Sequence, residues 1–233
     1  MTGWATPGGL FAGLRDAAAA DWRRYVEHPF VAGLADGTLP EPVFRAYLVQ
    51  DWLFLLQFAR AFALAAYKSD RLDDMRQATA GLDAIINLEM GLHIRYCAGW
   101  GIDEAALAAA EEHPHTVAYT RYVLDAGMAG DLLDLHVALA PCMLGYGEIG
   151  ARLIADPATR RDGNPYMSWI EMYGGEEFQA AARAEEAMLD RLYARRGGQS
   201  RLPDLQRIFG AATRLEAAFW QMGFDIAAAE AAR

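Results

Sequence analysis

The stretch EPVFRAYLVQDWLFLLQFARAFALAAYK, residues 41–68, decides the fold class of this chain. Apolar side chains recur along it at the three- and four-residue spacing of an α-helix. Between residues 47 and 66 they occupy more than one face of that helix, so neighbours have to cover it on both sides. The stretch therefore predicts a long helix that either forms the middle of a two-layer bundle or meets another subunit.

The rest of the chain follows the same helical pattern, and strand-like alternation of apolar and polar residues is almost absent. Glycine and proline stand between the helical segments, but no glycine-, serine- or proline-rich linker separates two parts of the chain. We therefore predict an all-α bundle of about seven helices in a single domain spanning residues 1–233. The other predicted helices cover residues 10–26, 71–98, 117–125, 131–155, 176–194 and 202–224.

Composition restricts the possible partners. The formal net charge of -10 disfavours nucleic acid and anionic lipid, whose phosphates repel an acidic protein. The longest nearly uncharged run, residues 135–147, is shorter than the roughly 20 residues needed to cross a bilayer, and the N-terminus lacks a signal-peptide pattern. Cys97 and Cys142 lack the CxxC spacing of a zinc or disulfide motif, and so few cysteines fit a reducing compartment. We predict a cytoplasmic protein that binds neither nucleic acid nor membrane.

Two acidic residues lie among aromatic side chains. Asp51 lies three residues before Phe54 in VQDWLF, and Glu216 lies three residues before Phe219 in RLEAAFW. A buried carboxylate has to be paired or hydrogen-bonded, and one held against aromatic rings tends to acquire the raised pKa of a general acid. The alternatives are an Asp51 that bonds to the backbone or to a neighbouring arginine, and a surface Glu216 that pairs with Arg214 or with a residue one turn away.

A thiol and two tyrosines form a second group of candidates. Cys142 directly follows a proline in the apolar segment APCMLGYGE, where the helix has to bend or begin, and such a bend often opens space for a ligand. Tyr146 is one helical turn further on, on the same face. A neighbour that accepts its proton would make Cys142 a nucleophile, whereas most helical cysteines are inert apolar residues. Tyr173, at the end of WIEMYGG, either belongs to a helix C-cap or turns its hydroxyl into a cavity.

Glu89 and His93 are one helical turn apart, a spacing at which both side chains could bind a metal ion inside a bundle. Such a pair is only half of a di-iron carboxylate site, so we predict no bound metal. An iron-dependent oxygenase or oxidase with Glu89 and His93 among its ligands remains an alternative.

The order of several short segments resembles the TenA/thiaminase II family over residues 22–224. The resemblance implies a haem-oxygenase-like helical bundle that binds no haem, needs no cofactor and usually assembles as a homotetramer. The segments that carry it are HPF at 28–30, DGTLP at 36–40, QD at 50–51, EMGLH at 89–93, PC at 141–142, YGG at 173–175 and EAAFW at 216–220.

The resemblance also implies an activity. The family hydrolyses small pyrimidines, releasing 4-amino-5-hydroxymethyl-2-methylpyrimidine from 4-amino-5-aminomethyl-2-methylpyrimidine, from thiamine, or from both, in thiamine salvage. Besides the iron enzyme, a non-catalytic pyrimidine-binding regulatory protein with this fold remains an alternative.

Roles for individual residues follow from the same resemblance. Cys142 matches the nucleophile, Glu216 the acid, and Asp51 the carboxylate that holds the ring nitrogen and amino group of the pyrimidine. Phe54 stands where some members have a tyrosine, so the hydrogen bond of that hydroxyl is lost here; Phe54 and Phe219 are expected to stack on the ring. The remaining matches are tyrosines that hydrogen-bond the ring or surround the acid: Tyr119, Tyr146 and Tyr173.

Overall fold

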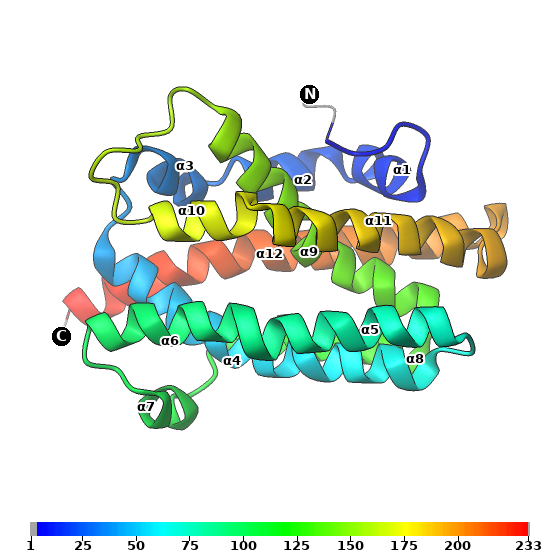
Figure 1. Cartoon of the computed structure of the whole chain (residues 1–233), viewed down its shortest axis with the longest axis horizontal. Coiled ribbons are helices and arrows are strands. Elements are labelled where there is room, and N and C mark those ends of the chain that lie inside the picture. Colours follow the sequence, from blue (N-terminus) through cyan, green and yellow to red (C-terminus); the bar gives the residue numbers. More distant parts are fainter. Residues whose placement is uncertain (1–3, 233) are drawn as a thin grey trace. The chain divides into compact units, whose positions relative to one another are not determined.

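The computed structural model describes residues 4–232, and within this range every regular element is a helix, as predicted (Figure 1). In chain order the elements are α1 (Leu10–Ala17), α2 (Ala19–Val26), α3 (Pro29–Asp36), α4 (Glu41–Lys68), α5 (Leu72–Ala84), the π-helix η1 (Ile85–Glu89), α6 (Met90–Gly99), α7 (Glu104–Ala109), α8 (Pro114–Ala129), α9 (Leu132–Ala155), α10 (Met167–Gly174), α11 (Glu176–Arg196), the 3-10 helix η2 (Gln199–Arg201) and α12 (Leu202–Ala231).

The contacts within the chain define two compact units. Unit 1 contains Met1–Pro40 and His136–Ala217, and unit 2 contains Glu41–Leu135 and Ala218–Arg233. Two helices, α9 and α12, run through both units. The single domain expected from the sequence stays a prediction.

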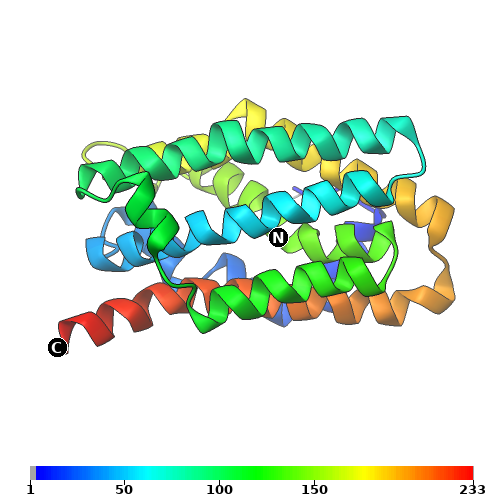
Figure 2. The ribbon, with the colours of Figure 1, turned by 90° about the horizontal axis from the view of Figure 1, so that it is seen from below.

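Unit 2 is built around α4, which begins and ends at the predicted residues. Figure 2 shows α4 running between α5 and α8, and α6 packs against it as well. These neighbours cover several faces of α4, as its apolar pattern requires. By length and composition both α4 and α9 could span a membrane, but 67% and 72% of their most apolar windows are buried inside the protein. Burial of this kind is typical of core helices.

The predicted helix 71–98 is interrupted by η1. There the N–H of Met90 bonds to the carbonyl of Ile85, five residues back, which is one residue more than in an α-helix. The widened turn changes the direction in which the side chains of α6 point relative to those of α5. The predicted helix 10–26 is also interrupted, at Ala18, and the short helices α3 and α7 were not predicted.

Two histidines start helices in the same way. The Nδ1 atoms of His28 and His113 accept hydrogen bonds at 3.2 Å from the backbone N–H groups of Phe30 and His115. In both cases proline occupies the first helical position, where its missing N–H costs nothing. The HPF segment therefore starts α3, with His28 as the N-cap and Pro29 and Phe30 inside the helix.

In unit 1, two glycines of α9 allow neighbouring helices to pack closely against it. A Cβ at Gly145 would lie 2.2 Å from the ring of Tyr25, and a Cβ at Gly150 would lie 2.4 Å from the backbone of Tyr173. Glycine at these two positions therefore lets α2 and α10 reach the surface of α9. Pro141 lies inside α9 rather than at its start.

We expect Gly150→Ala to lower the free energy of unfolding by about 1–3 kcal/mol, because the new methyl group would overlap the backbone of α10. The control is Gly13→Ala in α1, where a Cβ meets nothing within 4 Å and the better helix former should be neutral or slightly stabilising. Urea unfolding followed by circular dichroism measures both. Equal stability of the two variants would contradict the close packing of α10 on α9.

Candidate active site

The carboxylate of Asp51 is buried in the middle of α4, in unit 2, and is hydrogen-bonded as predicted. Its Oδ2 accepts a hydrogen bond from the hydroxyl of Tyr47 at 2.7 Å, one turn earlier on the same helix. The same oxygen lies 2.7 Å from Nε2 of His93, which α6 contributes. The partners are therefore a tyrosine and a histidine, not the backbone or an arginine.

His93 is completely buried and has a partner at each ring nitrogen. Nδ1 lies 2.9 Å from the carbonyl oxygen of Glu89, and Nε2 faces Asp51. Burial alone would lower the pKa of His93, but the hydrogen bond and charge of Asp51, together with the charge of Glu89, raise it above its usual 6.5. His93 thus favours the charged form.

The metal alternative fits this geometry poorly. A metal ion at His93 would have to replace either Asp51 or the carbonyl of Glu89 as partner of the ring. Across residues 4–232 no group of three or more His, Cys, Asp or Glu side chains is arranged to hold a metal ion.

Three of the predicted ring-binding residues meet in the aromatic core of unit 2. The ring centroid of Phe54 lies 5.0 Å from that of Tyr119 on α8 and 5.4 Å from that of Phe219 on α12. The ring of Tyr47 lies 6.1 Å from that of Phe219. The residue that binds Asp51 therefore also touches the aromatic group, which is how a flat aromatic ligand with polar edges is commonly recognised.

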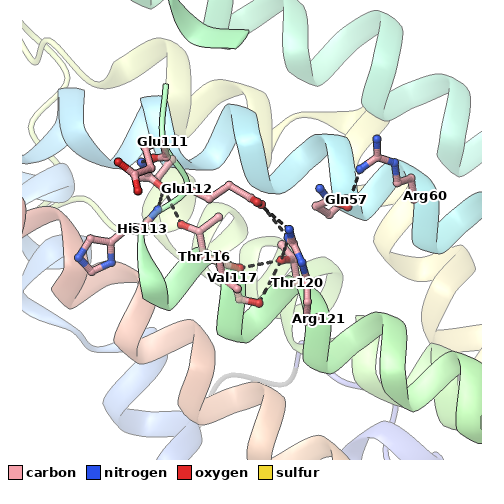
Figure 3. Close-up of polar contacts among 10 residues, drawn as sticks. Gln57, Arg60, Glu111, Glu112, His113, Thr116, Val117, Thr120 and Arg121 are labelled. Atoms are coloured by element: carbon pink, nitrogen blue, oxygen red, sulfur yellow. Dashed lines mark hydrogen bonds and ion pairs between the residues drawn. The ribbon is translucent and has the colours of Figure 1, made fainter. Parts of the chain in front are cut away.

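Gln50, the neighbour of Asp51, joins α4 to the start of α8. Its Oε1 accepts hydrogen bonds at 2.8 Å from the N–H of His113 and from the hydroxyl of Thr116, and its Nε2 donates to the carbonyl of Glu111 at 3.0 Å. In Figure 3 His113 and Thr116 lie at the beginning of α8, and Glu112 and Arg121 face each other beside them as a bidentate ion pair. These bonds hold the helix that carries Tyr119.

The thiol of Cys142 lies in the part of α9 that belongs to unit 1 and is partly exposed. Cys97 provides a contrast, because it is fully buried and burial raises the pKa of its thiol to about 11. Of the two thiols, Cys142 is therefore the one that a reagent or substrate can reach.

Aromatic side chains surround the next turn of α9. The ring centroid of Tyr173 lies 4.8 Å from that of Tyr146 and 4.4 Å from that of Trp169 on α10. The Nε2 of Gln179 on α11 donates to the carbonyl oxygens of Tyr173 at 2.8 Å and Gly147 at 2.9 Å. This glutamine ties the end of α10 to α9, so the two predicted tyrosines stay together.

Glu216 is buried in the part of α12 that belongs to unit 1, with 1% of its surface exposed. The alternative of a surface glutamate is wrong because Glu216 is buried. Arg214, one of the two partners considered for it, pairs with Asp21 at 3.0 Å. The burial is compatible with the role of an acid next to apolar surroundings.

The sequence predicted eight site residues, and the structure divides them between the two units. Unit 2 contains Asp51, Phe54, Tyr119 and Phe219, and unit 1 contains Cys142, Tyr146, Tyr173 and Glu216. Sequence reasoning missed Tyr47, Gln50 and Trp169, and it considered His93 only as a possible metal ligand in the alternative of an iron enzyme. The one-turn spacing between Tyr47 and Asp51 was a usable signal. His93, 42 residues from Asp51, offered none.

Comparison with known proteins places the chain in a family. Residues 15–225 match the TENA/THI-4/PQQC family. The chain is 37% identical to an aminopyrimidine aminohydrolase of Halalkalibacterium halodurans over 92% of this chain and 95% of that protein. Its sequence is 46% identical to that of a TenA family transcription regulator from Silicibacter sp. TM1040. The crystal structure of that protein superposes with a TM-score of 0.87, over 91% of this chain and 95% of that one.

A more distant structure confirms the fold class. A domain of unknown function with a heme oxygenase-like fold from Shewanella denitrificans has a TM-score of 0.70 and 15% identity, over 92% of each chain. The haem-oxygenase-like bundle expected from the sequence is therefore confirmed.

We expect the difference in unfolding free energy between the wild type and His93→Gln to depend on pH. Because the folded protein raises the pKa of His93, its contribution, about 1.5–3 kcal/mol, should be complete below about pH 6.5 and disappear as the pH rises through the raised value. Urea unfolding over this pH range measures the difference. Tyr47→Phe removes an uncharged donor from the same carboxylate and should show a nearly constant loss; an equally constant loss for His93→Gln would contradict the charged histidine.

Proposed function

Since the chain belongs to the TENA/THI-4/PQQC family, we propose that it is an aminopyrimidine aminohydrolase of thiamine salvage. Its substrate would be 4-amino-5-aminomethyl-2-methylpyrimidine, thiamine, or both, and its product 4-amino-5-hydroxymethyl-2-methylpyrimidine. The observation that carries the proposal is Asp51, a buried carboxylate with two donors on one oxygen and an aromatic group beside it.

In the proposed complex Asp51 binds the polar edge of the pyrimidine, its amino group and adjacent ring nitrogen. Tyr119 hydrogen-bonds the ring, and Phe54 and Phe219 stack on its faces by offset contact. Because Phe54 has no hydroxyl, it contributes area but no hydrogen bond to the ring. These residues all belong to unit 2.

The reaction needs a nucleophile because water does not readily displace an amine from the methylene carbon. We assign this role to Cys142: its thiolate forms a C–S bond to the ring carbon adjacent to the one that bears the methylene. The ring electrons then form an exocyclic double bond and break the C–N bond, so that the amine leaves. The hydrogen bond from Tyr119, whose donor is in position before the reaction begins, stabilises the negative charge that develops on the ring.

Glu216 is assigned the proton transfers. It gives a proton to the departing amine and then takes one from the water that adds to the methylene carbon. Breaking the C–S bond restores the aromatic ring and releases the pyrimidine alcohol and the free thiolate. Tyr146 and Tyr173, which contact each other, are assigned to orient this acid.

We also propose that the protein is cytoplasmic and assembles as a homotetramer. Large apolar side chains on the surface of unit 2 support the assembly, since a subunit interface would remove them from water. Tyr67, 87% exposed, is the most prominent. The others are Leu56, Leu72, Met75, Ile86, Val117 and Met128.

A non-catalytic regulator is the second candidate, because the solved relative from Silicibacter sp. TM1040 is described as a transcription regulator. The two candidates differ in turnover: a regulator would bind the pyrimidine and release it unchanged.

We expect the wild-type protein, without added metal, to convert 4-amino-5-aminomethyl-2-methylpyrimidine to the alcohol with many turnovers per chain. Product formation from this compound and from thiamine, at equal concentration, is followed by liquid chromatography. A faster reaction with the aminomethyl compound would identify a salvage hydrolase, and a faster reaction with thiamine a thiaminase. Binding of both without conversion would contradict the hydrolase proposal and favour the regulator.

We expect Cys142→Ser to lose about 10³-fold or more in kcat, because a hydroxyl is a much weaker nucleophile than a thiolate. Cys97→Ala is the matched control: this thiol is buried and protonated, so its loss should leave kcat within about twofold once stability is checked. Steady-state kinetics on folded protein measures both. Full turnover by Cys142→Ser would rule out the covalent route.

A further inference from the structure

The two ring nitrogens of His93 determine its protonation. Nδ1 lies 2.9 Å from the carbonyl oxygen of Glu89, and a carbonyl oxygen can only accept, so Nδ1 carries a proton. Nε2 lies 2.7 Å from Oδ2 of Asp51, a distance typical of a charge-assisted bond. Either Nε2 donates to a carboxylate, or a protonated Asp51 donates to Nε2.

The hydrogen bond from Tyr47 distinguishes between these two protonation states of the pair. The Tyr47 hydroxyl donates to the same Oδ2 at 2.7 Å, and an ionised oxygen accepts two donors better than the oxygen of a neutral acid that has to give its own proton away. The titratable groups that face the pair are Tyr47 on α4 and Glu89 on η1, and the charge of Glu89 also favours a cationic ring. The pair is therefore imidazolium and carboxylate.

We propose that His93 is a positioning residue: as an imidazolium it holds Oδ2 of Asp51 together with Tyr47, which keeps Asp51 ionised and leaves Oδ1 to bind the aminopyrimidine. Both hydrogen bonds of the Asp51 carboxylate go to Oδ2, and no donor within residues 4–232 bonds to Oδ1. An ionised Oδ1 is an acceptor, which suits the N–H of the amino group and, in a pyrimidine that binds with its ring nitrogen already protonated, the N–H of that nitrogen as well. The catalytic consequence rests on the proposed function, but the charge state of His93 does not.

The first experiment determines the protonation state of the His93 ring by ¹⁵N NMR of the unliganded full-length protein at pH 7.5. We expect both ring nitrogens to carry protons, and the signals to be assigned by their loss in His93→Gln or by their shift in Tyr47→Phe. A ring with one protonated nitrogen would overturn the proposal, whatever the activity of the protein.

The second experiment uses kinetics and product binding. His93→Gln keeps a donor near Oδ2 but removes the charge, so we expect a loss of about ten- to a hundredfold both in kcat/KM for the aminomethyl compound and in calorimetric affinity for the alcohol product. Tyr47→Phe, which keeps the charge, should lose less. Unchanged values for His93→Gln would show that His93 is merely structural and overturn the proposal.

The matched control is His136→Gln. His136 is equally buried, and its Nδ1 lies 2.6 Å from Oε1 of Glu185, so the substitution removes a comparable histidine–carboxylate bond in unit 1. We expect it to cost stability without changing the affinity for the product; equal losses of affinity in both variants would overturn a specific role for His93. If the wild type binds the product but hydrolyses neither pyrimidine, the proposed function fails, while the NMR and binding results still decide the role of His93.

Discussion

A carboxylate withdrawn from water inside an aromatic helix is the constraint on which the interior of unit 2 depends. Asp51 costs several kcal/mol to bury as an isolated ion, so two other groups have to compensate for the lost water. Tyr47 does so from the same helix and His93 from α6. Replacing such a pair by apolar residues of similar volume would often be as stable, so its presence is better explained by a ligand than by stability alone.

Unit 1 positions its candidate residues by a different means. There the backbone of α10 packs against Gly150 of α9, and Gln179 binds carbonyl groups of both helices. Backbone contacts and ring packing thus hold the rings of Tyr146 and Tyr173 against each other. A rigid frame of this kind suits residues that have to keep the geometry of a reactive acid.

The sequence was sufficient where a strong local pattern existed. Helix 41–68 was predicted to its ends because its apolar residues are continuous. The aromatic residues beside Glu216 favoured its burial, but the sequence left a surface position open as well. The interruptions at Ala18 and at η1 have no glycine or proline to mark them, and the short helix α7 is too brief for a helical period to show. The bond between Asp51 and His93 depends on tertiary packing, so no spacing rule could have found it.

The π-helix η1 determines which side chain of α6 faces Asp51. Its turn contains one residue more than a turn of an α-helix, and such turns are frequent at functional sites. Each residue of an α-helix turns the following side chains by about 100° about the axis. Loss of a single codon between residues 85 and 89 would therefore rotate α6 so that a different side chain replaced His93 opposite Asp51. A change of chain length at this point would therefore alter the partner of Asp51 without any substitution at residue 51 or 93.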